Sequence, residues 1–176
     1  MNKHSIRVSR NVLVLLLLCG AATARAQGRS ALSLAGRYHP LSAALPEVPY
    51  GKGDYSGMVG LELHEGDAFW QLAVDLAPEA ENAPEADLIV TPQVNLLFRD
   101  RMVVGGLGIL KTYVDDDTRD DKWTDIYYQF ALGFDAPLGR KLTLTAMAYY
   151  PFAKWNKLSD FEFDELDYAV GLRYFF

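Results

Sequence analysis

The chain has 176 residues, of which 50% are hydrophobic, and it carries 17 basic and 23 acidic residues for a formal net charge of −6. This length suits one domain, and the acidic balance argues against nucleic-acid binding, which requires basic surfaces. The only cysteine, Cys19, excludes a disulfide within the chain.

The first 26 residues have the pattern of a secretory signal peptide. Three basic residues precede an apolar run at 12–18, and Ala24-Arg25-Ala26 supplies the small-x-small motif that signal peptidases cut after. The apolar run is much shorter than the roughly 20 residues that a transmembrane helix needs. We therefore predict a signal peptide over 1–26 and a mature domain over 27–176, with 13 basic and 23 acidic residues, a net charge of −10.

Alternation of apolar and polar residues predicts eight strands in the mature domain. They lie near 30–39, 54–64, 68–77, 87–99, 102–114, 123–135, 141–150 and 164–176. Short turns alternate strictly with longer polar segments between these strands. This alternation is typical of an all-β protein, an eight-stranded up-and-down antiparallel transmembrane β-barrel with long loops at one end.

Residue size indicates which face of the strands points outward. An apolar face turned into the lumen would describe a soluble ligand-carrying barrel, whereas an apolar face turned outward would describe a membrane barrel. The polar faces contain several small residues, which suit a crowded barrel axis better than a solvated outer surface. These are Gly60, Ala73, Ala131, Gly133, Ala169 and Gly171. We therefore expect the apolar faces to meet lipid.

One predicted strand, 102–114, does not show which face is apolar. Val103 and Leu107 favour one orientation and Val104 the other, so the direction of Lys111 stays open. Pro92 lies in the middle of the preceding strand, where it removes a backbone hydrogen-bond donor, and we expect a bulge there.

The C-terminal strand gives the clearest pattern. From Leu166 to Phe176 every second residue is apolar, and the intervening residues up to Arg173 are small or charged. With a signal peptide, eight strands and this terminal aromatic segment, the chain resembles the small outer-membrane barrels of Gram-negative bacteria, including the outer membrane protein A and X and opacity-type proteins. The resemblance implies an outer-membrane location, and recognition of Tyr174 and Phe176 as a signal by the outer-membrane assembly machinery. It also implies contact with outer-membrane lipid and lipopolysaccharide.

Polar residues on the inward faces predict a charged network in the lumen. Eight strands leave a lumen just wide enough for side chains, so a general diffusion pore is not expected. Buried charges must pair or be hydrated, which favours a polar plug over a narrow cation path. The predicted network contains Arg37, Glu62, Asp75, Gln93, Asp125, Asp167 and Arg173.

Acidic residues crowd one predicted loop. Carboxylates at this density offer oxygen ligands to Ca²⁺ or Mg²⁺. Their spacing lacks the pattern of a dedicated calcium loop, so a solvated loop is the favoured interpretation and a cation site the alternative. The candidate ligands for a divalent cation are Asp115, Asp116, Asp117, Asp120 and Asp121.

The mature domain has two histidines, His39 and His64, and no motif that predicts catalysis. Ser42 lies close enough to His39 in sequence to allow a hydroxyl, imidazole and carboxylate set, but nothing in the pattern selects it. We predict no catalytic residue and no cofactor. The expected function is a structural or surface-interaction role in adhesion or envelope integrity. The alternatives are a lipid A-modifying enzyme and a narrow cation channel.

Overall fold

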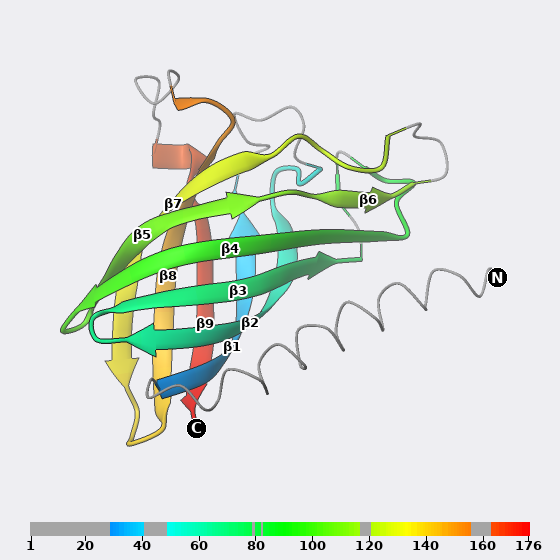
Figure 1. The fold of residues 1–176 in the computed structure, drawn as a ribbon. Coiled ribbons are helices and arrows are strands. Elements are labelled where there is room, and N and C mark those ends of the chain that lie inside the picture. Colours follow the sequence, from blue (N-terminus) through cyan, green and yellow to red (C-terminus); the bar gives the residue numbers. More distant parts are fainter. Residues whose placement is uncertain (1–28, 41–48, 79, 82, 117–120, 156–162) are drawn as a thin grey trace.

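The computed structural model describes residues 29–40, 49–78, 80–81, 83–116, 121–155 and 163–176. The predicted signal peptide lies outside these residues. Nine strands carry the labels of Figure 1, and a short 3-10 helix, η2 (Phe163–Glu165), precedes the last strand. The strands are β1 (Arg29–His39), β2 (Asp54–Glu65), β3 (Ala68–Ala77), β4 (Leu88–Asp100), β5 (Val103–Leu110), β6 (Tyr113–Asp115), β7 (Tyr127–Pro137), β8 (Leu142–Phe152) and β9 (Asp167–Phe175).

The strands form one closed antiparallel sheet (Figure 1). β1 to β5 pair in sequence order, β5 pairs with β7, β7 with β8 and β8 with β9, and pairing of β9 with β1 closes the ring. Because β5 and β6 both pair with β4, they form successive halves of one barrel strand. The molecule is therefore an eight-stranded up-and-down antiparallel barrel, as the sequence predicted.

Short turns and long connections lie at opposite ends of the barrel. We call these the turn end, which also holds Arg29 and Phe175, and the loop end. Gly66 and Arg101 have positive φ angles of 63° and 54°, and each lies in a tight turn at the turn end. Among the described residues, no helix is long and apolar enough to span a membrane.

Pro92 interrupts hydrogen bonding without shifting the strand register. Gln93 is paired with Leu110 and Val90 with Tyr113, so β4 keeps the same register before and after the proline. The Lys111 N–H donates to the Pro92 carbonyl oxygen at 3.3 Å, but proline has no N–H to return that bond. The predicted bulge was therefore wrong, and the lost donor instead divides the strand into β5 and β6.

The orientation of this strand is now settled. Val103, Leu107 and Ile109 are exposed on the outer face, whereas Val104 and Leu110 are buried inside. Lys111 is exposed, and its Nζ lies 5.6 Å from the ring centroid of Trp123.

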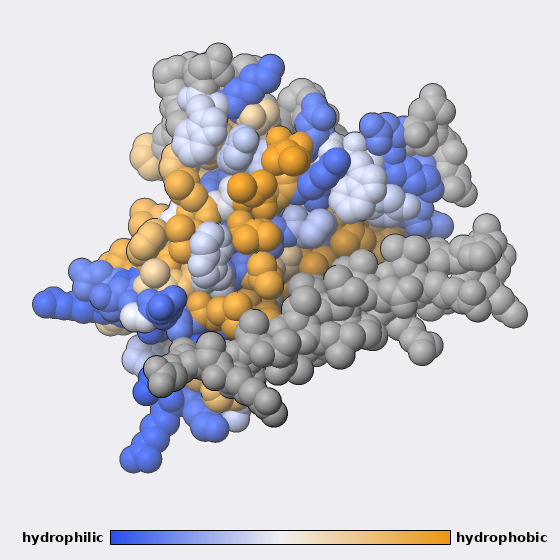
Figure 2. All heavy atoms as spheres, viewed as in Figure 1, coloured by the Kyte–Doolittle hydropathy of each residue, from blue (hydrophilic) through white to orange (hydrophobic). Residues whose placement is uncertain are grey.

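On the face seen in Figure 2, hydrophobic residues gather along the barrel and hydrophilic residues gather toward its ends. Large hydrophobic residues remain exposed around the barrel instead of being buried, which is the arrangement of a protein whose surroundings are lipid. They include Leu34, Trp70, Val94, Phe98, Leu132, Phe134, Val170 and Tyr174.

Candidate functional site: a charged lumen and its cap

At the turn end, Arg173 is surrounded by acids. Its Nε lies 2.5 Å from Oε2 of Glu62, and its Nη1 donates to Asp135. His64 contacts the same Glu62 oxygen at 2.9 Å, and Arg99 lies 3.7 Å from Asp135. We call Arg173, Glu62, Asp135 and His64 the turn-end cluster. Each of its four side chains is buried, and every charge faces an opposite one.

The loop end holds a second cluster around Arg37. Its Nη1 lies 2.9 Å from Oδ2 of Asp75, and its Nη2 lies 2.8 Å from Oδ2 of Asp167. The guanidinium carbon lies 4.5 Å from the ring centroid of Tyr149, a cation–π contact. His39 places Nδ1 3.1 Å from Oδ1 of Asp167. We call Arg37, Asp75, Asp167 and His39 the loop-end cluster.

Four amide side chains connect the two clusters. Arg37 donates to Gln129 at 3.2 Å, and Gln129 donates to Gln93 at 2.7 Å and to Asn95 at 2.8 Å. Asn95 donates to Gln71 at 2.9 Å, and Gln71 donates to Glu62 at 3.0 Å. We call Gln71, Gln93, Asn95 and Gln129 the amide bridge. Hydrogen bonds thus run along the lumen from one ion cluster to the other.

Gly108 makes room for this bridge. A Cβ atom at Gly108 would lie 1.9 Å from Oδ1 of Asn95, which is itself fully buried. The absence of a side chain on β5 therefore lets β4 fill the lumen. Because polar side chains fill the lumen and bond to one another, they form a plug that stabilises the fold together with a buried apolar cluster around Phe69 and Leu97.

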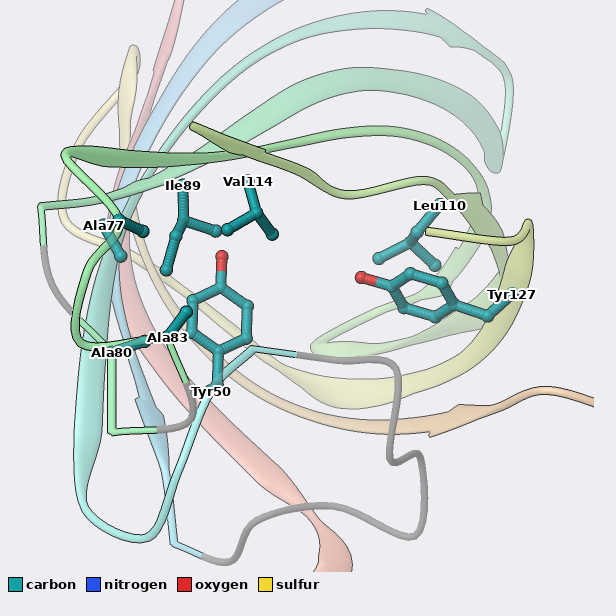
Figure 3. Packing of buried hydrophobic residues seen from close by; sticks show 9 residues of the cluster. Tyr50, Ala77, Ala80, Ala83, Ile89, Leu110, Val114 and Tyr127 are labelled. Atoms are coloured by element: carbon teal, nitrogen blue, oxygen red, sulfur yellow. The ribbon is translucent and has the colours of Figure 1, made fainter. Parts of the chain in front are cut away.

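Loop residues cover the lumen at the loop end (Figure 3). Tyr50 packs with Ala80, Ala83 and Ala86 from the β3–β4 connection, and with residues of the strand ends. Its ring stacks on His39 with centroids 4.0 Å apart and an interplanar angle of 7°. We call Tyr50, Ala80, Ala83 and Ala86 the cap. Burial raises the pKa of the Tyr50 phenol well above its usual range, so the phenol stays neutral.

Asp54 joins the two loops that carry the cap. Its Oδ2 accepts hydrogen bonds from the Gly51 N–H at 2.6 Å and the Glu81 N–H at 2.9 Å, and the Lys52 N–H donates to Glu81 at 2.8 Å. A Cβ at Gly51 would lie 2.2 Å from Cβ of Glu81, so only glycine allows this approach. The cap is therefore tied to the first residue of β2.

Six of the seven residues predicted for the lumen are buried there, and the two clusters and the bridge include all six. They are Arg37, Glu62, Asp75, Gln93, Asp167 and Arg173. The placement of Asp125 was wrong. It is exposed, because β7 begins only at Tyr127 and Asp125 lies beyond the barrel rim.

The sequence reasoning missed Asp135, His39 and His64 as lumen residues. Each follows an inward residue by two positions, so extending the alternation past the predicted strand core would have found them. The contact between His39 and Ser56, at 3.1 Å, depends on pairing between β1 and β2 and has no signal in the sequence.

The candidate metal ligands are only partly described. Asp117 and Asp120 lie outside the described residues, so the cation site remains a prediction. Asp115 bonds to Lys122 at 2.9 Å, Asp121 accepts the Trp123 N–H, and Asp116 is buried. Within the described part of the chain, no three His, Cys, Asp or Glu residues are grouped to hold a metal ion.

The C-terminal aromatics lie on the outside of the turn end. Tyr174 pairs with Leu32 on β1 and with Leu142 on β8, and the Phe176 N–H donates to the Ser30 carbonyl oxygen at 3.1 Å. Both side chains are exposed.

No protein-family model and no curated protein matches the sequence. Among solved structures, the Neisserial surface protein A matches with a TM-score of 0.51 and 14% identity over 85% of this chain and 97% of that chain. A de novo designed transmembrane β-barrel matches with a TM-score of 0.49 and 10% identity, covering 85% and 96%. Ail, the attachment invasion locus protein of Yersinia pestis, matches with a TM-score of 0.46 and 13% identity, covering 85% and 99%. The likeness to the Neisserial surface protein confirms that this chain has the fold of the small eight-stranded transmembrane barrels.

Proposed function

We propose that the chain is an integral protein of the outer membrane of a Gram-negative bacterium, with a structural or surface-interaction role. One combination carries this proposal: the barrel is apolar outside and plugged with paired charges inside. A soluble carrier barrel needs the reverse arrangement, an apolar lumen with space for its ligand. Because the lumen of a plugged membrane barrel is filled, only its outer wall and its loops are accessible to other molecules.

In this proposal, residues 1–26 direct export and are cleaved after Ala26. The outer-membrane assembly machinery recognises Tyr174 and Phe176. Both side chains are exposed at the turn end, where β1 begins. This exposure supports the assignment, because a recognition signal must be accessible to the machinery that binds it.

The loop end is the proposed contact surface. Trp123, Trp155 and Phe163 are exposed beside acidic residues, and the exposed fraction of Phe163 reaches 77%. Aromatic rings among charged residues suit both the lipid headgroup region and a protein partner. Lipopolysaccharide is the proposed lipid partner, with divalent cations at the acidic loop that includes Asp115 and Asp121 bridging to its phosphates.

A narrow cation channel is the rival function, and the ion pairs argue against it. A cation on the axis would have to pass Arg37 and Arg173, each of which is held between two acids. In planar lipid bilayers we expect no stable conductance from the wild-type protein. Discrete, cation-selective openings would replace the plug interpretation with the channel.

Membrane insertion is tested by expressing the full chain and separating outer membranes. We expect the protein in the outer-membrane fraction, without its first 26 residues by mass spectrometry. Unboiled and boiled samples should differ in mobility on a denaturing gel, because a closed barrel resists the detergent until heated. A soluble periplasmic protein without a mobility shift would overturn the proposal.

A further inference from the structure

Ser56 contacts His39 of the loop-end cluster, so that Ser56, His39 and Asp167 form a chain of contacts. The Ser56 hydroxyl oxygen lies 3.1 Å from Nε2 of His39, and Nδ1 of the same ring lies 3.1 Å from Oδ1 of Asp167. The order of hydroxyl, imidazole and carboxylate, and the ring nitrogen that faces each group, are those of a serine hydrolase triad. Ser42, considered from the sequence, lies outside the described residues, and the strand pairing provides Ser56 instead.

The surroundings fix the tautomer of His39. An ionised carboxylate only accepts hydrogen bonds, so Nδ1 carries the proton and donates a hydrogen bond to Asp167. In the neutral imidazole, Nε2 then has a lone pair that can accept a hydrogen bond from the Ser56 hydroxyl. The stacked ring of Tyr50 holds the imidazole plane, and Arg37 holds Asp167 through Nε at 3.1 Å. His39 is thus oriented as a general base for Ser56.

Arg37 lies on the strand next to that of Ser56. Arg37 is directly opposite Ser56 in the β1–β2 register, and both side chains are buried in the lumen. Residues paired in this way have Cβ atoms about 4.5–5.5 Å apart. The guanidinium is bound to Asp75 and Asp167, and through Asp167 it positions the His39 ring that faces Ser56.

We propose that Ser56 is a nucleophile that reacts with small acyl esters entering from the loop end. The Ser56 oxygen bonds to the ester carbonyl carbon while its proton passes to Nε2 of His39. The bond from that carbon to the leaving alcohol breaks, and the alcohol takes the proton from His39. Water then attacks the acyl-serine, releases the carboxylic acid and returns the proton to Ser56.

Tyr50 limits access to this site. Its ring covers His39, and the neighbouring cap alanines make the approach narrow and apolar. A substrate must therefore be small and have an apolar acyl group, and displacement of the Tyr50 side chain must precede the reaction. Replacing Tyr50 by a smaller residue should expose the nucleophile.

The test uses a fluorescent fluorophosphonate and the folded full-length protein, with folding verified by the gel mobility shift. The probe forms a bond from phosphorus to the serine oxygen and releases fluoride, so it reports an activated hydroxyl without requiring the natural ester. We expect an adduct on Ser56, identified by mass spectrometry, and at least tenfold faster labelling in Y50A. Labelling should disappear in S56A and fall at least a hundredfold in H39N, a loss typical of removing a general base.

S33A is the matched control, because Ser33 is also a buried lumen serine on a barrel strand. It should label as the wild type does. If H39N fails to fold, S56A and Y50A still decide the question. The proposal is overturned if folded wild type and folded Y50A both lack an adduct on Ser56, or if labelling persists in S56A.

Discussion

The two ends of the lumen contain the same set of groups in different surroundings. Each end has a buried arginine between two acids, and a histidine that contacts one of those acids. At the turn end, His64 stacks on Phe69 with centroids 4.3 Å apart, so its ring is enclosed by apolar neighbours. At the loop end, His39 meets the Ser56 hydroxyl and lies beneath loop residues. The same set of ion pairs thus encloses the histidine at the turn end, whereas at the loop end it leaves the histidine in contact with a hydroxyl that it can activate.

Removing either arginine should give the largest loss of stability, and more at the loop end. R37L leaves Asp75 and Asp167 buried without their cation, which costs about 3–5 kcal/mol. R173L should cost less, because Arg99 lies 3.7 Å from Asp135 and can take over part of the pairing. Urea unfolding in lipid vesicles, followed by tryptophan fluorescence, measures both free energies.

R37K is the control for this pair of variants. Lysine keeps the charge but cannot bond Asp75, Asp167 and Gln129 at once, so its stability should fall between wild type and R37L. Equal losses in R37L and R173L would show that Arg99 does not compensate.

Cutting the amide bridge should have a smaller effect. G108A places a Cβ against Asn95, and the strain of overpacking costs about 1–3 kcal/mol. G36A is the matched control, because a Cβ at Gly36 on β1 would meet nothing within 4 Å. It should be neutral or slightly stabilising in the same unfolding measurement. A loss of stability in G36A equal to that in G108A would mean that glycine is needed for its backbone and not for space.

The architecture could be predicted from the sequence because a barrel repeats one rule. Apolar residues alternate with small or polar residues along each strand. A residue's odd or even position in this alternation is enough to place Arg37, Glu62 and Arg173 inside the barrel. Asp125 was misplaced because this alternation does not show where a strand begins, and β7 begins only at Tyr127. Likewise, the role of Pro92 depends on whether the register shifts, and no local pattern determines that.

The loop-end site could not be predicted in the same way. Its contact between Ser56 and His39 joins neighbouring strands through their register, and the cap joins two loops. The sequence of the β3–β4 connection is typical of a polar loop. It contains Ala80, Ala83 and Ala86, whose role becomes visible only in the fold, where they cover the loop end of the lumen. Such contacts are tertiary, so composition and periodicity do not encode them.

The hydrogen bond that anchors the cap should contribute modestly. Y50F removes the hydroxyl that bonds Thr91 at 3.1 Å but keeps the ring stacked on His39. The expected loss is about 1 kcal/mol, the net value of one neutral hydrogen bond. Hydrogen exchange should show faster opening at the loop end and no change near Arg173. Equal acceleration at both ends would mean that the cap and the turn-end cluster unfold as one unit.

The smallest effects should come from two surface lysines, one near each end. Lys111 lies over Trp123 and Lys141 lies over Tyr174, at 5.6 and 5.7 Å from the ring centroids. Exposed cation–π contacts contribute about 0.5–1 kcal/mol, and tryptophan is the better partner, so K111M should destabilise slightly more than K141M.

The sign of each change in the free energy of unfolding is more informative than its size. A lysine within the hydrocarbon region costs roughly 2–4 kcal/mol at mid-depth and close to nothing at the interface, so methionine would stabilise a barrel whose lysine is submerged. A loss of stability in K111M therefore places Pro92 and the β5–β6 break at the membrane surface, whereas a gain places them within the lipid.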